Sequence, residues 1–320
     1  MKTWREKQRE NYRDWKILCD HLELDAIKRQ SILYHSQFPL NLPSRLAEKI
    51  EKNCLDDPIL LQFLPLTKES EEKEGFSVDP VMDTRFRKEK KLLQKYRGRV
   101  LLTVTSSCAM HCRFCFRQNF DYDTTDPSFD SELKAIAQDA TISEVILSGG
   151  DPLSLSNQRL ESLVDALSQI PHLKRLRIHT RFPIGIPERI DKELLAIFQA
   201  CKLSIFFVIH ANHPKELDSD VLSSLKKIHR LGIPVLNQSV LLKGVNNHFE
   251  TLKILCETLV NHGIMPYYLH QLDRVIGSWH FEVEESEGLS LIEELKKSLP
   301  GYAVPKYVKE IPGESAKTQI

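Results

Sequence analysis

The sequence has no excess of charge of either sign and no long apolar run. Its 320 residues include 44 Lys and Arg and 44 Asp and Glu, so the formal net charge is zero. A strongly basic nucleic-acid-binding protein is therefore excluded. No apolar run approaches the roughly 18 residues of a membrane span, and the polar start MKTWREKQRENYRDW excludes a secretory signal peptide. We expect a cytoplasmic protein without nucleic-acid or membrane partners.

The sequence also lacks an even set of cysteines. Seven is an odd number and the expected compartment is reducing, so a disulfide framework is not expected. Clustered cysteines then indicate metal ligands or reactive thiols. Hydrophobic residues (41%) and charged residues (28%) have the proportions of a globular chain, and one barrel-type α/β domain can use the whole length.

The first part of the chain differs from the rest. Apolar residues at helical spacing predict helices within 15–29 and 42–52, and the charged stretch 67–91 predicts a long, solvated connecting loop. The chain accordingly divides into a helical N-terminal region with its connecting loop (1–95), a barrel (96–282) and a C-terminal helix with a tail segment (283–320).

From residue 99 onward, short β-branched and aromatic runs alternate with amphipathic helical stretches. The predicted strands are 99–105, 144–148, 174–180, 203–210, 234–242 and 264–272. Strands alternating with helices imply a parallel sheet with right-handed crossovers. Six such units predict an α/β fold, a partial (β/α)6 TIM-type barrel, and an open doubly wound sheet is the alternative. In a parallel barrel the chemistry lies at the carboxyl ends of the strands.

Three cysteines, Cys108, Cys112 and Cys115, follow the first predicted strand within eight residues. A structural zinc ion takes four ligands, and an electron-transfer cluster normally takes four cysteines. Three thiols suit a [4Fe–4S] cluster that leaves one iron open for another molecule. Zinc, with His111 inside the loop, and chance clustering are the alternatives.

This spacing, C-x3-C-x2-C, resembles the hallmark of the radical S-adenosylmethionine (SAM) superfamily. The resemblance implies that the three cysteines hold three irons and that SAM chelates the fourth through its amino and carboxylate groups. Reduction by an external electron donor would then cleave SAM to a 5′-deoxyadenosyl radical. The segment after the second predicted strand looks like the family's glycine motif, whose exposed backbone approaches SAM: Ser148, Gly149, Gly150 and Asp151.

Further motifs resemble lysine 2,3-aminomutase: CFR at 115–117, NHP at 212–214, NQSVLLKGV at 237–245 and YYLHQLD at 267–273. RLRIHTRFPI, IPGESAK and the N-terminal DDPILLQFLP resemble the branch that makes (R)-β-lysine for modification of translation elongation factor P. This resemblance implies an isomerase that moves the 2-amino group of L-lysine to carbon 3. It also implies pyridoxal 5′-phosphate (PLP) as a second cofactor.

The resemblance assigns roles to residues around PLP. Lys317 in PGESAK occupies the place of the lysine that forms an imine with PLP. Arg99 matches a phosphate-binding arginine, and Lys95 falls where a second one lies. Gln238 adds a hydrogen bond, and His210 matches a position near the cofactors.

The resemblance also assigns the substrate contacts. Arg117 matches the residue that binds the substrate carboxylate, while Asp273 and Glu310 fall where carboxylates hold the ammonium tail. Catabolic lysine 2,3-aminomutase and glutamate 2,3-aminomutase are rival functions, although paired acids argue against an acidic substrate tail. A non-catalytic, cluster-bearing scaffold that binds elongation factor P is the rival of another class. The last cysteine is Cys256, so we expect no C-terminal zinc site between subunits.

Overall fold

A single curved sheet of ten strands forms the centre of the computed structural model, which describes residues 2–320. The strands lie across the sheet in chain order. β3 to β9 run parallel to one another, and β1, β2 and β10 are antiparallel to their neighbours. The strands are β1 (Arg87–Glu89), β2 (Leu92–Leu93), β3 (Arg99–Thr103), β4 (Glu144–Ser148), β5 (Arg175–Thr180), β6 (Ser204–His210), β7 (Val235–Val240), β8 (Ile264–His270), β9 (Lys306–Lys309) and β10 (Thr318–Gln319).

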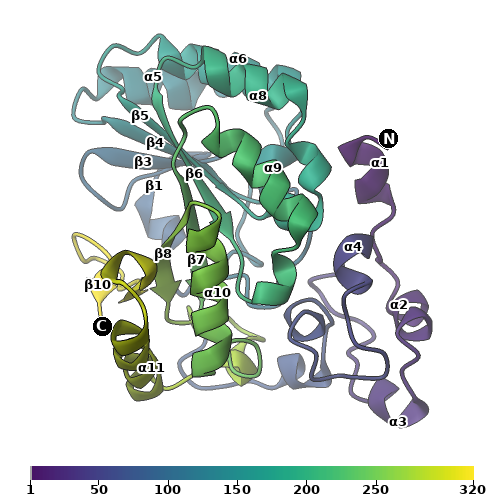
Figure 1. Cartoon of the computed structure of the whole chain (residues 1–320). Helices are drawn as coiled ribbons and strands as arrows, with labels where there is room; N and C mark the ends of the chain where they lie inside the picture. The colour runs from purple at the N-terminus through teal and green to yellow at the C-terminus, as the bar shows by residue number, and fades with distance from the viewer. Residues whose placement is uncertain (1) are drawn as a thin grey trace.

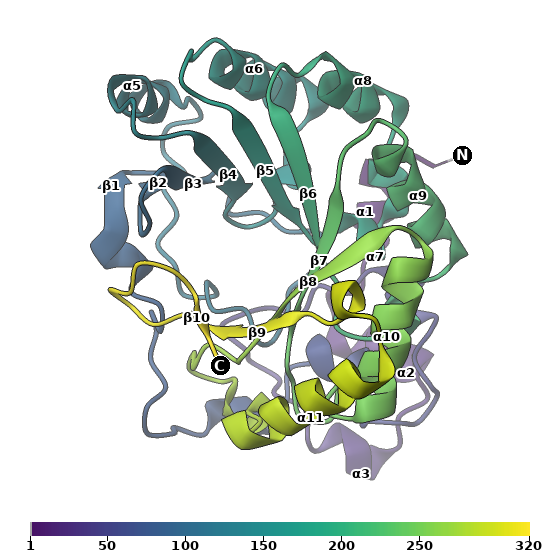
Figure 2. The same ribbon diagram turned by 60° about the vertical axis from the view of Figure 1, so that its left-hand side comes forward.

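Helices cover the outer face of this sheet, and the strands curve through most of a circle (Figure 2). One helix lies in each connection between consecutive parallel strands, and a second, short helix joins β5 to β6. None of the helices within residues 2–320 is long and apolar enough to cross a membrane. The helices are α1 (Trp4–Arg9), α2 (Trp15–His21), α3 (Ala26–Arg29), α4 (Ser44–Ala47), α5 (Asp130–Gln138), α6 (Asn157–Ser168), α7 (Phe182–Gly185), α8 (Lys192–Ala200), α9 (Ser219–His229), α10 (Phe249–Asn261) and α11 (Glu285–Ser298).

The barrel helices form because apolar residues recur at helical spacing behind a polar cap. In α6, Ser156 Oγ accepts the N–H of Arg159, and Leu160, Val164 and Leu167 are buried against the sheet. Asp191 caps α8 and Asp218 caps α9 in the same way. The large core cluster therefore fills the space between the sheet and its outer helices and continues into the N-terminal region.

The predicted (β/α) barrel is confirmed, and strand order following chain order distinguishes it from a doubly wound sheet. The structure adds a seventh parallel strand that the sequence analysis missed. β9 follows α11 and pairs with β8, so residues 285–309 continue the β/α alternation. The strand has only four residues, KYVK, and its run is too short to show a clear pattern.

The predicted N-terminal helices are shorter than expected. The 15–29 stretch divides into α2 and α3, because Glu23 adopts a left-handed conformation (φ 56°) and Asp25 caps a new helix. The 42–52 stretch forms only the single turn α4. As Figure 1 shows, this region lies beside the barrel near α9 and α10.

The predicted connecting loop is also partly wrong, because residues 87–93 form the hairpin β1–β2 at the edge of the sheet. Lys91 at its turn is buried. Its backbone N–H donates to Glu132 at 3.1 Å, and its ammonium donates to the carbonyl of Ser128 at 2.7 Å. These contacts order a segment whose charge indicated a solvated loop.

The inner face of the sheet carries polar side chains. Along β5, the inward residues Arg175, Arg177 and His179 are partly accessible, while the alternating Leu176 and Ile178 are fully buried under the helices. The barrel interior can therefore hold charged ligands.

Candidate active site

The three motif cysteines lie on the loop that follows β3, and their free, partly buried thiols are close enough to influence one another's pKa. Burial, helped by the neighbouring Cys112, raises the pKa of the Cys115 thiol to about 11. Burial also raises the pKa of Cys108 well above its ordinary value, and Asp151, Cys115 and Cys112 add to the shift. Three thiolates confined in this way need positive charge between them, which a metal cluster supplies.

A guanidinium reaches the middle cysteine from another strand. Arg181, directly after β5, donates from Nη1 to Sγ of Cys112 at 2.8 Å. Its Nη2 donates to Gln62 at 2.6 Å and to Glu216 at 2.8 Å. Burial raises the pKa of the Cys112 thiol, whereas Arg181 opposes that shift. The sequence analysis assigned no role to Arg181, because it meets the motif only in three dimensions.

The N-terminal region forms a wall around the cysteine loop. Asn11 Nδ2 donates to the carbonyl of Ala109 at 2.7 Å, and the N–H of Arg113 donates to the carbonyl of Gln62 at 2.9 Å. The buried Arg113 side chain donates from Nε to Glu69 at 2.9 Å. This region therefore fixes the position of the cluster loop.

The zinc alternative would need a fourth ligand from the cysteine loop. His111 is the candidate that the sequence offers, and its Nδ1 lies 2.8 Å from the carbonyl of Pro39. One nitrogen of this ring is therefore already engaged by the chain.

The predicted glycine motif packs directly against the cysteine loop. Gly149 has φ +116°, and a Cβ there would lie 2.7 Å from the carbonyl oxygen of Thr105. A Cβ on Gly150 would lie 2.4 Å from the carbonyl oxygen of Ser107. Only glycine allows this approach. The two glycines thus hold the loop that carries the cysteines, while their contact with SAM stays a prediction.

The other two residues of that motif already have partners in the chain. Ser148 Oγ accepts a hydrogen bond from Arg117 Nη1 at 3.2 Å. Asp151 accepts from the hydroxyl of Thr180 at 2.7 Å and from three backbone N–H groups, those of Leu153, Arg181 and Phe182. Burial raises the pKa of Asp151 to about 6 against these hydrogen bonds. Its carboxylate ties the β4 loop to the β5 loop.

A chain of ion pairs links the tail lysine to the residue that follows the cluster motif. Lys317 Nζ donates to Glu310 at 2.6 Å, and Lys95 Nζ lies 3.7 Å from the other oxygen of Glu310. Lys95 pairs with Asp83 at 2.7 Å, and Asp83 accepts from Arg117 Nε at 2.6 Å. The structure therefore brings Lys317, Glu310, Lys95 and Arg117 together.

Two residues of this network differ from the sequence-based expectation in their surroundings. Lys95 lies between the carboxylates of Asp83 and Glu310, which balance its charge, and its role at the PLP phosphate stays a prediction. Asp83, which the sequence analysis missed, is the buried hub of the network. Burial alone would raise the pKa of Glu310, but Lys317, Tyr96 and Lys95 together hold it below its ordinary value.

Asp273, which follows β8, has no ionic partner in the described part of the chain, unlike Glu310. It forms no side-chain hydrogen bond and no ion pair within residues 2–320. Burial raises its pKa to about 6; Lys317 opposes the shift and Glu310 adds to it. Asp273 therefore lies near the Lys317–Glu310 pair with its carboxylate available to a cation.

Three further predicted residues face the barrel interior. Arg99 begins β3, stacks its guanidinium 4.6 Å from the ring centre of Tyr96 and forms no ion pair in the described part of the chain. Its charge is thus available to an anion. Gln238 Nε2 lies 3.5 Å from Nδ1 of His179, and His210 Nε2 lies 3.1 Å from Oδ1 of Asn212.

Comparison with known proteins places this site in a family. The profile of the radical SAM superfamily matches residues 102–255. L-lysine 2,3-aminomutase of Haemophilus influenzae is 41% identical over 309 residues, which cover 95% of this chain and 91% of that protein. The chain belongs to the lysine 2,3-aminomutase family. The Escherichia coli L-lysine 2,3-aminomutase is also 41% identical (88% of this chain, 83% of that protein), and the Clostridium subterminale one is 33% identical (85% and 66%).

Membership of this aminomutase family confirms that the chain is a radical SAM enzyme. A radical SAM methyltransferase from Sphaerobacter thermophilus has the same fold, with a TM-score of 0.50 and 16% identity over 68% of each chain. At that identity the likeness concerns the fold alone.

The residues of the aminomutase fit the cofactors that the family implies, which are a [4Fe–4S] cluster, SAM and PLP. Three partly buried thiols and the Arg181 guanidinium are suited to an anionic cluster. A primary amine, Lys317, lies next to the interior, and Arg99 offers an unpaired cation. These are the functional groups that a cluster and a phosphorylated aldehyde require.

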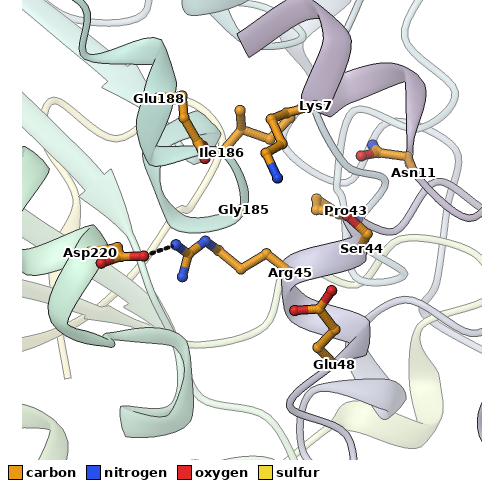
Figure 3. Close-up of a pocket in the computed structure, with 10 residues that line it drawn as sticks. All are labelled: Lys7, Asn11, Pro43, Ser44, Arg45, Glu48, Gly185, Ile186, Glu188 and Asp220. Carbon is orange, nitrogen blue, oxygen red and sulfur yellow. Dashed lines mark hydrogen bonds and ion pairs between the residues drawn. The ribbon is translucent and has the colours of Figure 1, made fainter. Parts of the chain in front are cut away.

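A separate hollow lies between the N-terminal region and the barrel (Figure 3). Arg45 and Asp220 form an ion pair across it, and Glu48 and Gly185 line it. None of the predicted site residues contributes to this hollow. The ion pair between Arg45 and Asp220 holds the N-terminal region against α9.

Proposed function

We propose that this aminomutase converts L-lysine to (R)-β-lysine by moving the amino group from carbon 2 to carbon 3. The observation that carries the proposal is the position of Lys317. Its ammonium ends a four-carbon chain and lies 2.6 Å from Glu310, with the unpaired Asp273 nearby. The same pair of carboxylates can accept the alkylammonium tail of a substrate lysine once Lys317 is engaged with PLP.

Arg117 is the proposed partner of the substrate carboxylate. Its Nε and Nη1 are used by Asp83 and Ser148, and its Nη2 has no hydrogen bond within residues 2–320. Asp83 and Ser148 hold the guanidinium plane in place, so Nη2 can donate without reorientation. Arg117 lies two residues after Cys115, which brings the α-carbon end of the substrate close to the cluster loop.

The cofactors are proposed to lie between these groups. When bound, the cluster and SAM supply the radical that removes a substrate hydrogen, and PLP supplies the ring that carries the migrating amino group. Cys108, Cys112 and Cys115 hold the cluster, and Lys317 holds PLP. The barrel interior, once filled by cofactors and substrate, would exclude water from the reacting centre.

The charges in the interior support lysine over glutamate. A glutamate tail would bring a third carboxylate to Asp273 and Glu310, and like charges at close range are unfavourable. A catabolic role remains the rival use of the same reaction. The resemblance of RLRIHTRFPI and IPGESAK to the elongation factor P branch supports that branch instead.

The proposal also covers the use of the product, the electron donor and the cellular compartment. The product would supply the modification of translation elongation factor P, and an external one-electron donor would reduce the cluster. Seven free cysteines suit a reducing compartment, so we place the enzyme in the cytoplasm.

The test uses purified, anaerobically reconstituted protein with SAM, PLP and a chemical reductant. L-Lysine and L-glutamate are supplied in separate reactions, and chiral chromatography identifies the product. We expect (R)-β-lysine from lysine and no β-glutamate. A Cys112→Ser protein treated identically is the control and should give neither product. β-Glutamate as the main product would reject the substrate assignment.

A further inference from the structure

A histidine with an unused ring nitrogen faces the interior of the barrel. His179 is the last inward-facing residue of β5, two residues beyond Arg177 on the same face. Its Nε2 is shielded from solvent and has no hydrogen-bond partner within residues 2–320. A buried polar atom without a partner is costly, so it indicates a ligand that completes the site.

The neighbour of His179 decides which nitrogen carries the proton. Gln238 Nε2 lies 3.5 Å from Nδ1 of the ring. With the amide nitrogen of Gln238 turned toward the ring, Nδ1 is the acceptor, and this arrangement assigns the proton of the neutral ring to Nε2. His179 therefore presents a hydrogen-bond donor to the interior.

The charges around this donor favour an anionic acceptor. Burial lowers the pKa of His179 well below its ordinary value, and Arg177, Lys317 and Arg117 lower it further. The ring is thus neutral, and the groups that act on it most strongly after burial are cations. Lys317 among them is the residue proposed to carry PLP.

We infer that His179 Nε2 donates a hydrogen bond to an anionic oxygen of PLP and that Gln238 positions the ring for this contact. The inference rests on the proposed PLP dependence. PLP offers two such oxygens, on the phosphate and on the phenolate of the ring, and either would satisfy Nε2. His179 is then a cofactor-binding residue to which the sequence analysis assigned no role.

The experiment measures the affinity of the purified full chain for PLP and for pyridoxal, which lacks the phosphate, by absorbance titration. His179→Met removes the donor, and His179→Gln places an amide donor near the position of Nε2. His179→Met should bind PLP about tenfold to a hundredfold more weakly, because a hydrogen bond to a charged group is lost. His179→Gln should remain within about threefold of the parent. His229→Met, on the exposed face of α9, is the matched control and should leave affinity unchanged.

Pyridoxal separates the two acceptors. A loss confined to PLP indicates the phosphate, and an equal loss for both ligands indicates the phenolate; both outcomes support the inference. PLP affinity of His179→Met equal to that of the parent, or an equal loss in His179→Gln and His179→Met, would overturn it. A parent protein that binds no PLP would instead overturn the proposed function and this inference together.

Discussion

Replacing Asp273 with asparagine should change stability and substrate binding in opposite directions. Burial raises the pKa of Asp273 from its ordinary 3.8 to about 6. A difference of about 2 units corresponds to about 3 kcal/mol against the ionised native state at neutral pH. Because the folded pKa is raised, this cost is absent below about pH 4, grows between pH 4 and 6, and is complete above pH 6. Asp273→Asn should therefore be up to about 3 kcal/mol more stable than the parent at pH 8.

The same substitution should weaken lysine binding. Removing one partner of a buried charge pair costs about 2–5 kcal/mol, which is roughly 30-fold to a few thousand-fold in the dissociation constant. Glu310 remains to hold the ammonium, so the lower part of that range is expected. A residue that costs stability in the free protein and contributes affinity in the complex belongs to a binding site.

Two measurements test this pair of effects. Chemical denaturation at pH 8 and pH 4 gives the stability difference, which should be present at pH 8 and absent at pH 4. Anaerobic calorimetry with PLP and SAM but without reductant gives lysine affinity without turnover. Asp165→Asn, on the exposed face of α6, should change neither quantity. Unaltered lysine affinity in Asp273→Asn, or a less stable variant at pH 8, would refute the reasoning.

The other expectations concern the cluster loop and the tail. Cys112→Ser should lose most bound iron and all SAM cleavage by iron and sulfide analysis, whereas Cys201→Ser should keep both; full iron content in Cys112→Ser would contradict the assignment. Gly150→Ala places a Cβ 2.4 Å from the carbonyl oxygen of Ser107, so cluster content should fall even though every cysteine remains. Lys317→Ala should abolish the borohydride-trapped PLP adduct seen by peptide mass spectrometry while it retains iron, and an adduct on another lysine of the parent would show that the motif was wrongly placed.

Features formed by residues close together in the sequence could be predicted from the sequence alone. Cys108, Cys112 and Cys115 lie on one loop, so their spacing alone predicts a shared metal group. Helices such as α6 were predicted because their apolar residues recur at helical spacing. The short strand β9 was missed because four residues carry too little periodicity, although its position after α11 repeats the β/α alternation.

Contacts between residues far apart in the sequence could not be predicted from the sequence alone. Asp83 lies in the stretch predicted to be a solvated loop, yet it is buried between Lys95 and Arg117. Arg181, which follows β5, contacts Cys112, which follows β3. The donor role of His179 Nε2 is inferred from the contact between the ring and Gln238. Side-chain direction on an inner barrel face depends on register, which no single stretch of sequence encodes.

The most direct test of lysine 2,3-amino migration follows the nitrogen itself. Reconstituted enzyme is incubated with L-[2-15N]lysine, SAM, PLP and reductant, and the product is examined by 15N and 13C nuclear magnetic resonance. The account predicts (R)-β-lysine with the 15N label fully retained and bonded to carbon 3. Unlabelled nitrogen at carbon 3, or unchanged lysine despite cleavage of SAM, would contradict it.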